Sequence, residues 1–412
     1  MAVMKPFCCI RPDAAVAEHV AALPYDVYNR KEACAEVARE PLSFLKIDRA
    51  ETQLDDSVDT YDGRVYRKAR ELLDDMLAKG ILVRDEAECY YIYELTMNGR
   101  AQTGIVACAS IDDYQNNVIK KHEKTRADKE ADRIHHVDVC NAQTGPIFLA
   151  YRSRQVINEA VEKAKKDAPL YDFTAPDEVR HTVWRIADRS TIDMLKNAFA
   201  EIDSIYIADG HHRAASAVRV GLMRREANPD YTGDEEFNFF LSVLFPDDQL
   251  MIMDYNRVVK DLNGHSTEEF LELAGESYEV EKLGTEAYKP VKAYETGMYL
   301  DGTWYKLTAK PSICSADPVE GLDVSLLQKH LLTPVLGIGD PKTDKRIDFV
   351  GGIRGLGELE RRTKEDMKVA FAMYPTSITQ LFAVADAGLL MPPKSTWFEP
   401  KLRSGLFIHE LS

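Results

Sequence analysis

The chain has 412 residues, 45% of them hydrophobic, and a formal net charge of −16. This apolar content is typical of a globular protein with a buried core, and the length suits two or three structural units. A protein that grips a nucleic-acid backbone needs a basic face to replace counterions, so the acidic balance argues against a nucleic-acid partner. No secretory signal opens the chain, and no apolar run approaches the roughly 20 residues that span a bilayer. We expect a cytoplasmic protein without a membrane partner.

The first half of the chain is predicted to mix helices and strands. A strand and loop precede a helix near Ala14–Leu23, and residues 61–80 have the apolar spacing of an amphipathic helix. The β-rich runs Tyr90–Thr96 and Thr103–Ser110 flank Asn98-Gly99, which predicts a hairpin. Further helices are expected at 127–136, 154–167, 190–200 and 213–225, and short strands at 147–151 and 205–208.

The second half is predicted to contain strands and helices around a glycine-rich loop. Phe237–Phe245 and Leu250–Val258 are expected to be paired strands, and Asp301-Gly302 is a second hairpin signal. A helix near 323–332 precedes a looped region at 335–357. A helix, a strand and a helix are expected after this loop.

A change in composition indicates the domain organisation. Residues 261–290 are rich in Glu and Gly, which is typical of a linker. We therefore predict a catalytic core with an N-terminal extension at 1–260. A C-terminal α/β region at 261–412 is predicted to complete the site. The mix of elements is α+β rather than a strict alternation of strands and helices.

The sharpest feature of the sequence is the run Asp209-Gly210-His211-His212-Arg213, which follows the predicted strand 205–208. The free N–H groups of a helix's first turn attract anions, and Gly210 lets the backbone approach a ligand closely. Arg213 adds a permanently charged fork suited to phosphate. His211 and His212 could donate hydrogen bonds, titrate or help to bind a metal, and Asp209 could hold Mg²⁺ or orient a histidine. The alternative is a simple turn and helix cap with solvated histidines.

A second candidate is the charged segment His122-Glu123-Lys124-Thr125-Arg126. Glu123 is a candidate general base, because a carboxylate can accept the proton of an attacking hydroxyl. Lys124 and Arg126 could neutralise phosphate charge, as phosphoryl transfer requires. The segment is not the zincin motif HExxH, since Arg126 stands where the second histidine would be. The alternative is a solvated charged helix.

Two more features carry candidate residues. Arg133 and His136 are three residues apart and are predicted to share one face of a helix. Prolines keep the segment Met391–Lys401 extended, and Lys394, Ser395 and Thr396 within it could contact a phosphate or carboxylate. The alternative for this segment is packing of its aromatic residues on the core. No GxxxxGK[ST] motif occurs, which excludes a P-loop enzyme.

Six motifs, in order along nearly the whole chain, resemble those of a widespread bacterial and archaeal family of proteins of unknown function. They are Arg11-Pro12, Pro24-Tyr25-Asp26-Val27, His122–Arg126, Ala142–Pro146, Asp209–Arg213 and Met391–Thr396. The Asp209–Arg213 run is also similar to the nucleotide-binding turn of the ParB/sulfiredoxin-like superfamily, which includes the free serine kinases. This resemblance implies an α+β fold with a ParB/sulfiredoxin-like nucleotide-binding core and a C-terminal α/β portion.

The resemblance also implies roles for particular residues. The run from Gly210 to Arg213 would hold the phosphates of a nucleotide, and Asp209 would lie beside the metal or the substrate. Glu123 is the first choice for the catalytic base, and Glu18 is a substitute. The predicted site residues are Glu123, Asp209 and His211 for catalysis; Gly210, His211, His212, Arg213, Arg126 and Thr125 for the nucleotide; Tyr25, Asp26, Lys394, Ser395 and Thr396 for the substrate; and Asp209 for the metal.

These residues together favour a kinase of a small hydroxylated metabolite, with free L-serine as the favoured acceptor. ATP or ADP would donate the phosphate, and Mg²⁺ would bridge the phosphates. One alternative is a nucleotide or phosphoester hydrolase that uses the same site. Another is a nucleotide-sensing module without turnover. The sequence leaves self-association into a homo-oligomer open.

Overall fold

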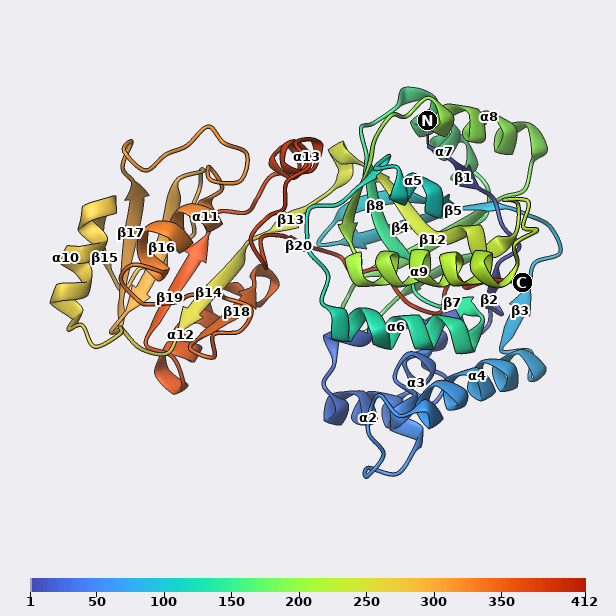
Figure 1. Ribbon diagram of the computed structural model, residues 1–412, viewed down its shortest axis with the longest axis horizontal. Helices are drawn as coiled ribbons and strands as arrows, with labels where there is room; N and C mark the ends of the chain where they lie inside the picture. Colours follow the sequence, from blue (N-terminus) through green and yellow to red (C-terminus); the bar gives the residue numbers. More distant parts are fainter. Residues whose placement is uncertain (1) are drawn as a thin grey trace. The chain divides into compact units, whose positions relative to one another are not determined.

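The structure is a computed structural model that describes residues 2–412 and divides into two compact units (Figure 1). Unit 1 contains the described residues up to Leu250 together with Pro400–Ser412, and unit 2 contains Met251–Glu399. The chain leaves unit 1 after Leu250 rather than after residue 260, because the strand Tyr255–Val259 is hydrogen-bonded within unit 2. The C-terminal segment Pro400–Ser412 returns to unit 1, whereas the composition of the sequence favoured one region at 261–412.

A mixed sheet forms the centre of unit 1. Among residues 2–412, its nine strands are β1 (Met4–Lys5), β4 (Tyr90–Met97), β5 (Arg100–Ser110), β6 (Ile119–Lys120), β8 (Ile147–Tyr151), β9 (Tyr171–Thr174), β10 (Arg180–Ile186), β11 (Ile205–Asp209) and β12 (Phe239–Pro246). Their order is β6-β11-β8-β12-β5-β4-β10-β9, and β1 pairs with β5. The β6–β11 and β8–β12 pairs are parallel and the other pairs are antiparallel. The sheet is therefore mixed, as expected of an α+β protein.

The predicted hairpins are confirmed. Asn98 and Gly99 join β4 to β5 with φ of 52° and 75°. Asp301 and Gly302 connect the two strands of the second predicted hairpin, which lies in unit 2, and their φ angles are 48° and 77°. Positive φ at both central residues is the mark of a type I′ turn, whose twist matches that of the flanking strands.

Some helices of unit 1 cover one face of this sheet, and others form a separate core. The helices of unit 1 are α1 (Ala17–Val20), α2 (Arg30–Arg39), α3 (Leu45–Asp48), α4 (Gly63–Ala78), α5 (Ile111–Gln115), α6 (Ala127–Cys140), α7 (Gln155–Ala164), α8 (Arg189–Ala200) and α9 (His211–Ala227), with short 3-10 turns at Tyr25–Val27, Ala50–Gln53, Glu236–Asn238 and Asp247–Gln249. The buried side chains of Leu149, Leu195 and Val218 belong to one core that α8 and α9 share with β8. Helix α6 lies beside α9, and α4 packs on α6 (Figure 1).

The C-terminal segment closes the opposite face of the sheet. Its Phe407 ring lies 5.5 Å from the rings of both Tyr91 and Tyr93 on β4. Strand β21 (His409–Glu410) pairs with β7 (Ala142–Gln143), and β2 (Ile10–Pro12) pairs with β3 (Leu82–Arg84). Single backbone bridges also join Ile408 to Ile10 and Ser404 to Ala22. The helix expected near Ala14–Leu23 is therefore reduced to α1, because the backbone at Ala22 is extended to pair with Ser404.

Unit 2 contains an antiparallel sheet of its own. Within Met251–Glu399, its strands are β14 (Tyr255–Val259), β15 (Tyr278–Gly284), β16 (Glu295–Leu300), β17 (Thr303–Ala309), β18 (Ile347–Gly351) and β19 (Val369–Met373), in the order β15-β17-β16-β19-β14-β18, and β13 (Ile252–Met253) pairs with β20 (Trp397–Phe398). Its helices are α10 (Thr267–Ser277), α11 (Asp323–Leu327), α12 (Gly355–Glu365) and α13 (Ile378–Asp386), with a π-helical turn at Gln328–Leu332 and a 3-10 turn at Gly352–Arg354. The predicted pairing of 237–245 with 250–258 is wrong, because β5 and β8 occupy both edges of β12.

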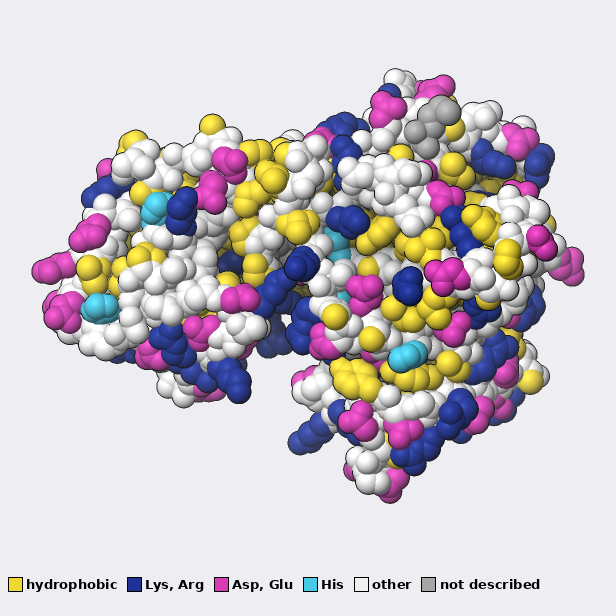
Figure 2. Space-filling model, in the orientation of Figure 1, with side chains coloured by type: hydrophobic (Ala, Val, Ile, Leu, Met, Phe, Trp, Pro, Cys, Tyr) yellow, Lys and Arg dark blue, Asp and Glu magenta, His cyan; other side chains and the backbone are white. Residues whose placement is uncertain are grey.

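Within residues 2–412, no helix has both the length and the apolarity that crossing a membrane requires. Figure 2 shows basic and acidic side chains interspersed over the face of unit 1 that carries α6 and α9, rather than a continuous basic surface on that face. A phosphate ligand would therefore need positive charge supplied locally.

Candidate active site

The turn between β11 and α9 has the geometry that the sequence suggested. Strand β11 ends at Asp209, Gly210 follows with φ of +92°, and α9 begins at His211. A Cβ atom at Gly210 would lie 3.0–3.2 Å from the guanidinium of Arg213. The backbone therefore favours glycine, and a Cβ atom there would also push the guanidinium of Arg213 away by a few tenths of an ångström. Among the described residues, no side chain caps the N-terminus of α9, so its first N–H groups keep their capacity to bind an anion.

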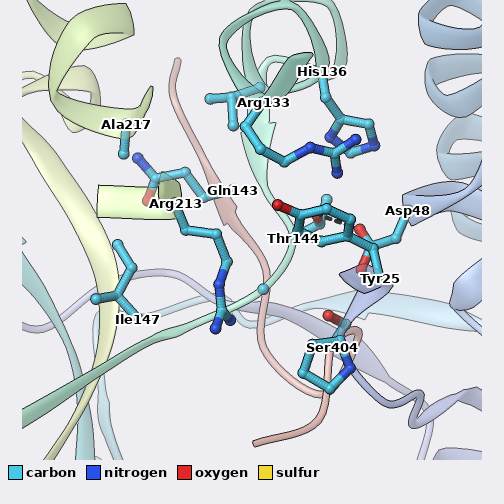
Figure 3. Close-up of a pocket in the computed structure, with 13 residues that line it drawn as sticks. Tyr25, Asp48, Arg133, His136, Gln143, Thr144, Ile147, Arg213, Ala217 and Ser404 are labelled. Carbon is cyan, nitrogen blue, oxygen red and sulfur yellow. Dashed lines mark hydrogen bonds between the residues drawn. The ribbon is translucent and has the colours of Figure 1, made fainter. Parts of the chain in front are cut away.

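A pocket lies in unit 1 beside this turn. It is lined by Pro24, Tyr25, Asp48, Arg133, His136, Val137, Gln143, Thr144, Gly145, Ile147, Arg213, Ala217 and Ser404 (Figure 3). These residues come from the loop before α2, from α3, α6, α9, β7 and β8, from the loop between β7 and β8, and from the C-terminal segment. The pocket therefore exists only where distant parts of the chain meet.

Arg213 contributes to the pocket a positive charge that forms no direct ion pair among the described residues. Its Nη1 donates a hydrogen bond of 2.6 Å to the carbonyl oxygen of Pro146. Among residues 2–412, no carboxylate lies within the 4.0 Å of its guanidinium that defines an ion pair. A guanidinium without a carboxylate partner is suited to bind a phosphate or carboxylate of a ligand.

Arg133 supplies a second cation, and it is held firmly. This side chain of α6 is buried, and its Nη2 lies 2.8 Å from a carboxylate oxygen of Asp132. The aromatic ring of Tyr25 lies 4.1 Å from the guanidinium carbon, which is a close cation–π contact. His136 also lines the pocket, so the predicted shared helical face is present. Burial, and then the charge of Arg133, lowers the pKa of His136.

Asp48 is the acidic side chain among the residues that line the pocket. It is 4% exposed, and one carboxylate oxygen accepts a hydrogen bond of 2.7 Å from the hydroxyl of Thr144, drawn dashed in Figure 3. Within residues 2–412, its other carboxylate oxygen has neither a hydrogen-bond nor an ion-pair partner. A buried carboxylate normally finds partners for both oxygens. This free oxygen is therefore available to a ligand.

Asp209 forms an ion pair behind the turn. Its carboxylate oxygens accept from the backbone N–H of Gly210 at 2.9 Å and from Nζ of Lys401 at 3.2 Å. Burial opposes ionisation of this group, but the charges of Lys401 and Arg213 outweigh it and lower the pKa of Asp209. Asp209 is therefore ionised throughout the neutral range and is a weak proton acceptor there.

The two predicted motifs meet at their histidines. The rings of His122 and His211 are buried, and their centroids lie 4.5 Å apart, edge to face. The ring of His212 accepts a hydrogen bond of 2.9 Å from the backbone N–H of Arg126. Burial lowers the pKa of His122 to about 4 and lowers the pKa of His211 as well, so both rings are neutral at pH 7. Within residues 2–412, Nδ1 of His122 and Nε2 of His211 have no hydrogen-bond partner.

The remaining predicted residues lie outside the pocket lining. The hydroxyl of Thr125 donates to Glu130, and the exposed side chain of Arg126 pairs with Asp128 at 2.8 Å. Glu123 is half-buried in the same segment, before α6, and Asp26 is exposed beside Tyr25. Of the predicted residues, the pocket lining thus includes Tyr25 and Arg213.

Lys394, Ser395 and Thr396 belong to unit 2. There the carbonyl of Lys394 accepts a hydrogen bond from Arg257, and the hydroxyl of Ser395 donates to the carbonyl of Pro392. Their predicted role in substrate binding stays a prediction.

The sequence did not assign Asp48, Thr144, Lys401 or Ser404 to the site. Asp48 had a weak signal, since it directly follows the largely apolar run at 44–47. Thr144 lies in a noted motif, but nothing local indicated its hydrogen bond to Asp48. Lys401 and Ser404 had no local signal, because only the return of the C-terminal segment brings them to unit 1.

A metal ion would have few protein ligands in this site. Within residues 2–412, no cluster of three or more His, Cys, Asp or Glu side chains is arranged to hold a metal. Mg²⁺ bound together with nucleotide phosphates needs only one or two carboxylates, because phosphates and water provide the rest. Asp209 fits this requirement as a single carboxylate.

Comparisons with known proteins give a family match and several distant structural similarities. A family model described as "Protein of unknown function (DUF1015)" matches residues 4–325. No curated protein matches the chain. A free serine kinase variant solved with AMP is 13% identical, with a TM-score of 0.37, over 73% of this chain and 92% of that chain.

Two further structures score similarly. SbnI with a C-terminal truncation, from Staphylococcus aureus, is 10% identical with a TM-score of 0.39, over 73% of this chain and 85% of that chain. A conserved hypothetical protein from Pyrococcus furiosus is 14% identical with a TM-score of 0.35, over 74% of this chain and 94% of that chain.

Proposed function

The chain belongs to the DUF1015 family, as its motifs predicted, and we propose that it transfers a phosphoryl group from ATP or ADP to a hydroxyl of a small metabolite. Free L-serine is the first acceptor to test. The observation that carries this proposal is the guanidinium of Arg213, which has no carboxylate partner within residues 2–412 and lies at the uncapped N-terminus of α9. Backbone N–H groups and a guanidinium together match the oxygens of a phosphate.

Two further cations would offset the charge of the phosphates. Arg133 lines the same pocket, and its contacts with Asp132 and Tyr25 fix its guanidinium. Lys401 lies at the back of the Gly210 turn, where Asp209 holds its ammonium group. Preorganised positive charge is the main means by which an enzyme stabilises the transition state of phosphoryl transfer.

Asp209 serves this arrangement as a fixed negative charge rather than as a base. Its lowered pKa keeps it ionised, so it can orient Lys401 or contribute one oxygen ligand to Mg²⁺. When bound, Mg²⁺ neutralises charge on the phosphates. His122 and His211 are neutral and can donate or accept hydrogen bonds without adding charge.

The test of this proposal is turnover of ATP or ADP with Mg²⁺ and L-serine, measured as phosphoserine formed. Arg213→Ala should lower kcat roughly 10³-fold, because an arginine on the transferred phosphoryl group contributes at least that much. Arg219→Ala is the matched control, since this arginine lies on the same helix but is exposed. Undiminished activity of Arg213→Ala would reject the assigned role.

The same assay separates the alternatives. A hydrolase would release inorganic phosphate at the same rate with and without L-serine. A nucleotide sensor would be stabilised by ATP, by about 2.7 kcal/mol at 100 times the dissociation constant, and would form no product. The proposal requires product that depends on the acceptor.

A further inference from the structure

We infer that Asp48 accepts the proton of the substrate hydroxyl during phosphoryl transfer. This inference rests on the proposed function and assigns the catalytic base within the same site. It replaces Glu123, which the sequence favoured for that role, with a residue that the sequence did not assign.

The geometry of Asp48 supports this role. The carboxylate is almost fully buried at the end of α3, yet one of its oxygens has no partner within residues 2–412. The other oxygen is fixed by the hydroxyl of Thr144 at 2.7 Å. A base must be held within hydrogen-bond reach of the proton that it abstracts. The hydroxyl of Thr144 holds one carboxylate oxygen of Asp48 in place, and the other oxygen can accept the proton of the substrate. Thr144 therefore acts as a positioning residue.

The charges around Asp48 suit a carboxylate that works beside phosphate. Asp48 interacts electrostatically with Arg133 and His136, which line the same pocket. Arg213 lines it too and has no carboxylate of its own among the described residues. The pocket therefore offers an unpaired cation for the transferred group and an unpaired carboxylate oxygen for the attacking hydroxyl. A hydroxyl acceptor and a phosphate donor need these two groups.

The other candidate bases are placed less well. Asp209 shares its carboxylate between Lys401 and the Gly210 N–H, and it would have to give up the Lys401 ion pair to take a proton. Glu123 lies before α6 and is not among the residues that line the pocket. Among the lining residues, Asp48 is the one that has a carboxylate.

The proposed step is a simple displacement. The substrate oxygen forms a bond to the terminal phosphorus while the bridging P–O bond breaks, and the nucleotide leaves with the electron pair of that bond. The proton of the hydroxyl passes to the free oxygen of Asp48 and is later lost to water. No oxidant, reductant or further reactant is needed.

The first experiment compares Asp48→Asn with the wild type in the L-serine assay. We expect kcat to fall at least about 10²-fold, which is typical of the loss of a general base, with little change in KM for L-serine. The control is Asp56→Asn, because the side chain of Asp56 is 98% exposed. An increased KM with unchanged kcat would overturn the inference, because Asp48 would then only hold the substrate.

A second experiment needs no acceptor and compares ATP with AMP in equilibrium binding. If Asp48 lies beside the transferred phosphoryl group, removal of its negative charge in Asp48→Asn should tighten ATP binding about five-fold and leave AMP binding unchanged. An unchanged ratio of the two affinities would overturn the inference while the proposed function stands. A wild type that binds neither nucleotide would overturn the proposed function itself.

The folding of the variants is checked by thermal unfolding. If Asp48→Asn does not fold, Asp48→Ser also removes the charge while it keeps a hydroxyl near Thr144. The same changes in kcat and in the ATP-to-AMP ratio are expected of it, and the absence of both changes would overturn the inference.

Discussion

At the scale of single residues, Gly210 combines a positive φ with a close approach to the guanidinium of Arg213. Its φ of +92° costs other residues about 1–3 kcal/mol, and a Cβ atom there would also meet Arg213. Gly80 has a similar φ of +68°, but a Cβ atom at Gly80 would have no neighbouring atom within 4 Å, so this position carries the backbone cost alone. Comparison of substitutions at Gly210 and Gly80 therefore separates the cost of backbone strain from the effect of displacing the Arg213 guanidinium.

We predict that Gly210→Ala and Gly80→Ala each lower the free energy of unfolding by about 1–2 kcal/mol. Only Gly210→Ala should also weaken ATP binding, because its methyl group displaces the guanidinium of Arg213. Urea unfolding and isothermal titration with ATP measure the two effects. Equal ATP affinities in the two variants would contradict the prediction.

Buried histidines at the same turn predict a dependence of stability on pH. The pKa of His122 is lowered from 6.5 to about 4 by burial. Between these two pH values, His122 binds a proton in the unfolded chain but not in the folded chain. The contribution of His122 to the free energy of unfolding is therefore complete above about pH 6.5 and is lost as the pH falls towards 4. Asp209 stays ionised in this range and does not add to the loss.

We predict that the wild type loses on the order of 3 kcal/mol of unfolding free energy between pH 7 and pH 4 through His122. His122→Gln should remove its own share of this dependence and leave the shares of His211 and His181, whose pKa values burial also lowers, while the exposed His135→Gln should leave the dependence intact. Urea unfolding at pH 7, 5.5 and 4.5 measures the slopes. A His122→Gln slope equal to that of the wild type would show that other groups cause the acid sensitivity.

At the scale of elements, the C-terminal segment is held in unit 1 by a network around the buried Arg403, which joins the exposed Asp177 to the buried His181. The guanidinium donates to both carboxylate oxygens of Asp177, at 2.6 and 2.5 Å, and to the ring of His181 at 3.2 Å. The other ring nitrogen of His181 lies 2.7 Å from the hydroxyl of Tyr93. Since Lys401 and Ser404 belong to the same segment, this network also holds part of the site in place.

We predict that Arg403→Met lowers the free energy of unfolding by about 2 kcal/mol, because it leaves the buried ring nitrogen of His181 without its donor. Arg84→Met is the matched control, since it removes an exposed ion pair with Glu410 of the same segment, and such pairs contribute at most about 1 kcal/mol. Urea unfolding measures both variants. The prediction fails if the control costs as much as Arg403→Met.

At the scale of the whole molecule, the pocket depends on backbone pairing between distant segments. The Ser404–Ala22 and Ile408–Ile10 bridges and the β21–β7 pair bring the C-terminal segment to the first strands and to the loop that carries Thr144. Asp48 is placed in the pocket by α3, whose apolar side chains share a separate core with those of α4. The residues that line this pocket are therefore not close together in the sequence.

Local features of the protein could be predicted without knowledge of its fold. These are the hairpins at Asn98-Gly99 and Asp301-Gly302, the helix that ends before Gly80 and the turn at Gly210. Each depends on a few neighbouring residues and on their φ preferences. The shared face of Arg133 and His136 was predictable for the same reason.

The polar groups that face the pocket could be identified only from the folded chain. Asp48, Thr144, Lys401 and Ser404 reach the site through long-range strand pairing and core burial, which no local pattern encodes. The pairing of 237–245 with 250–258 failed for the same reason, since β12 found its partners in β5 and β8. Local conformation follows from neighbouring residues, whereas the composition of a site follows from how the whole chain buries its apolar surface.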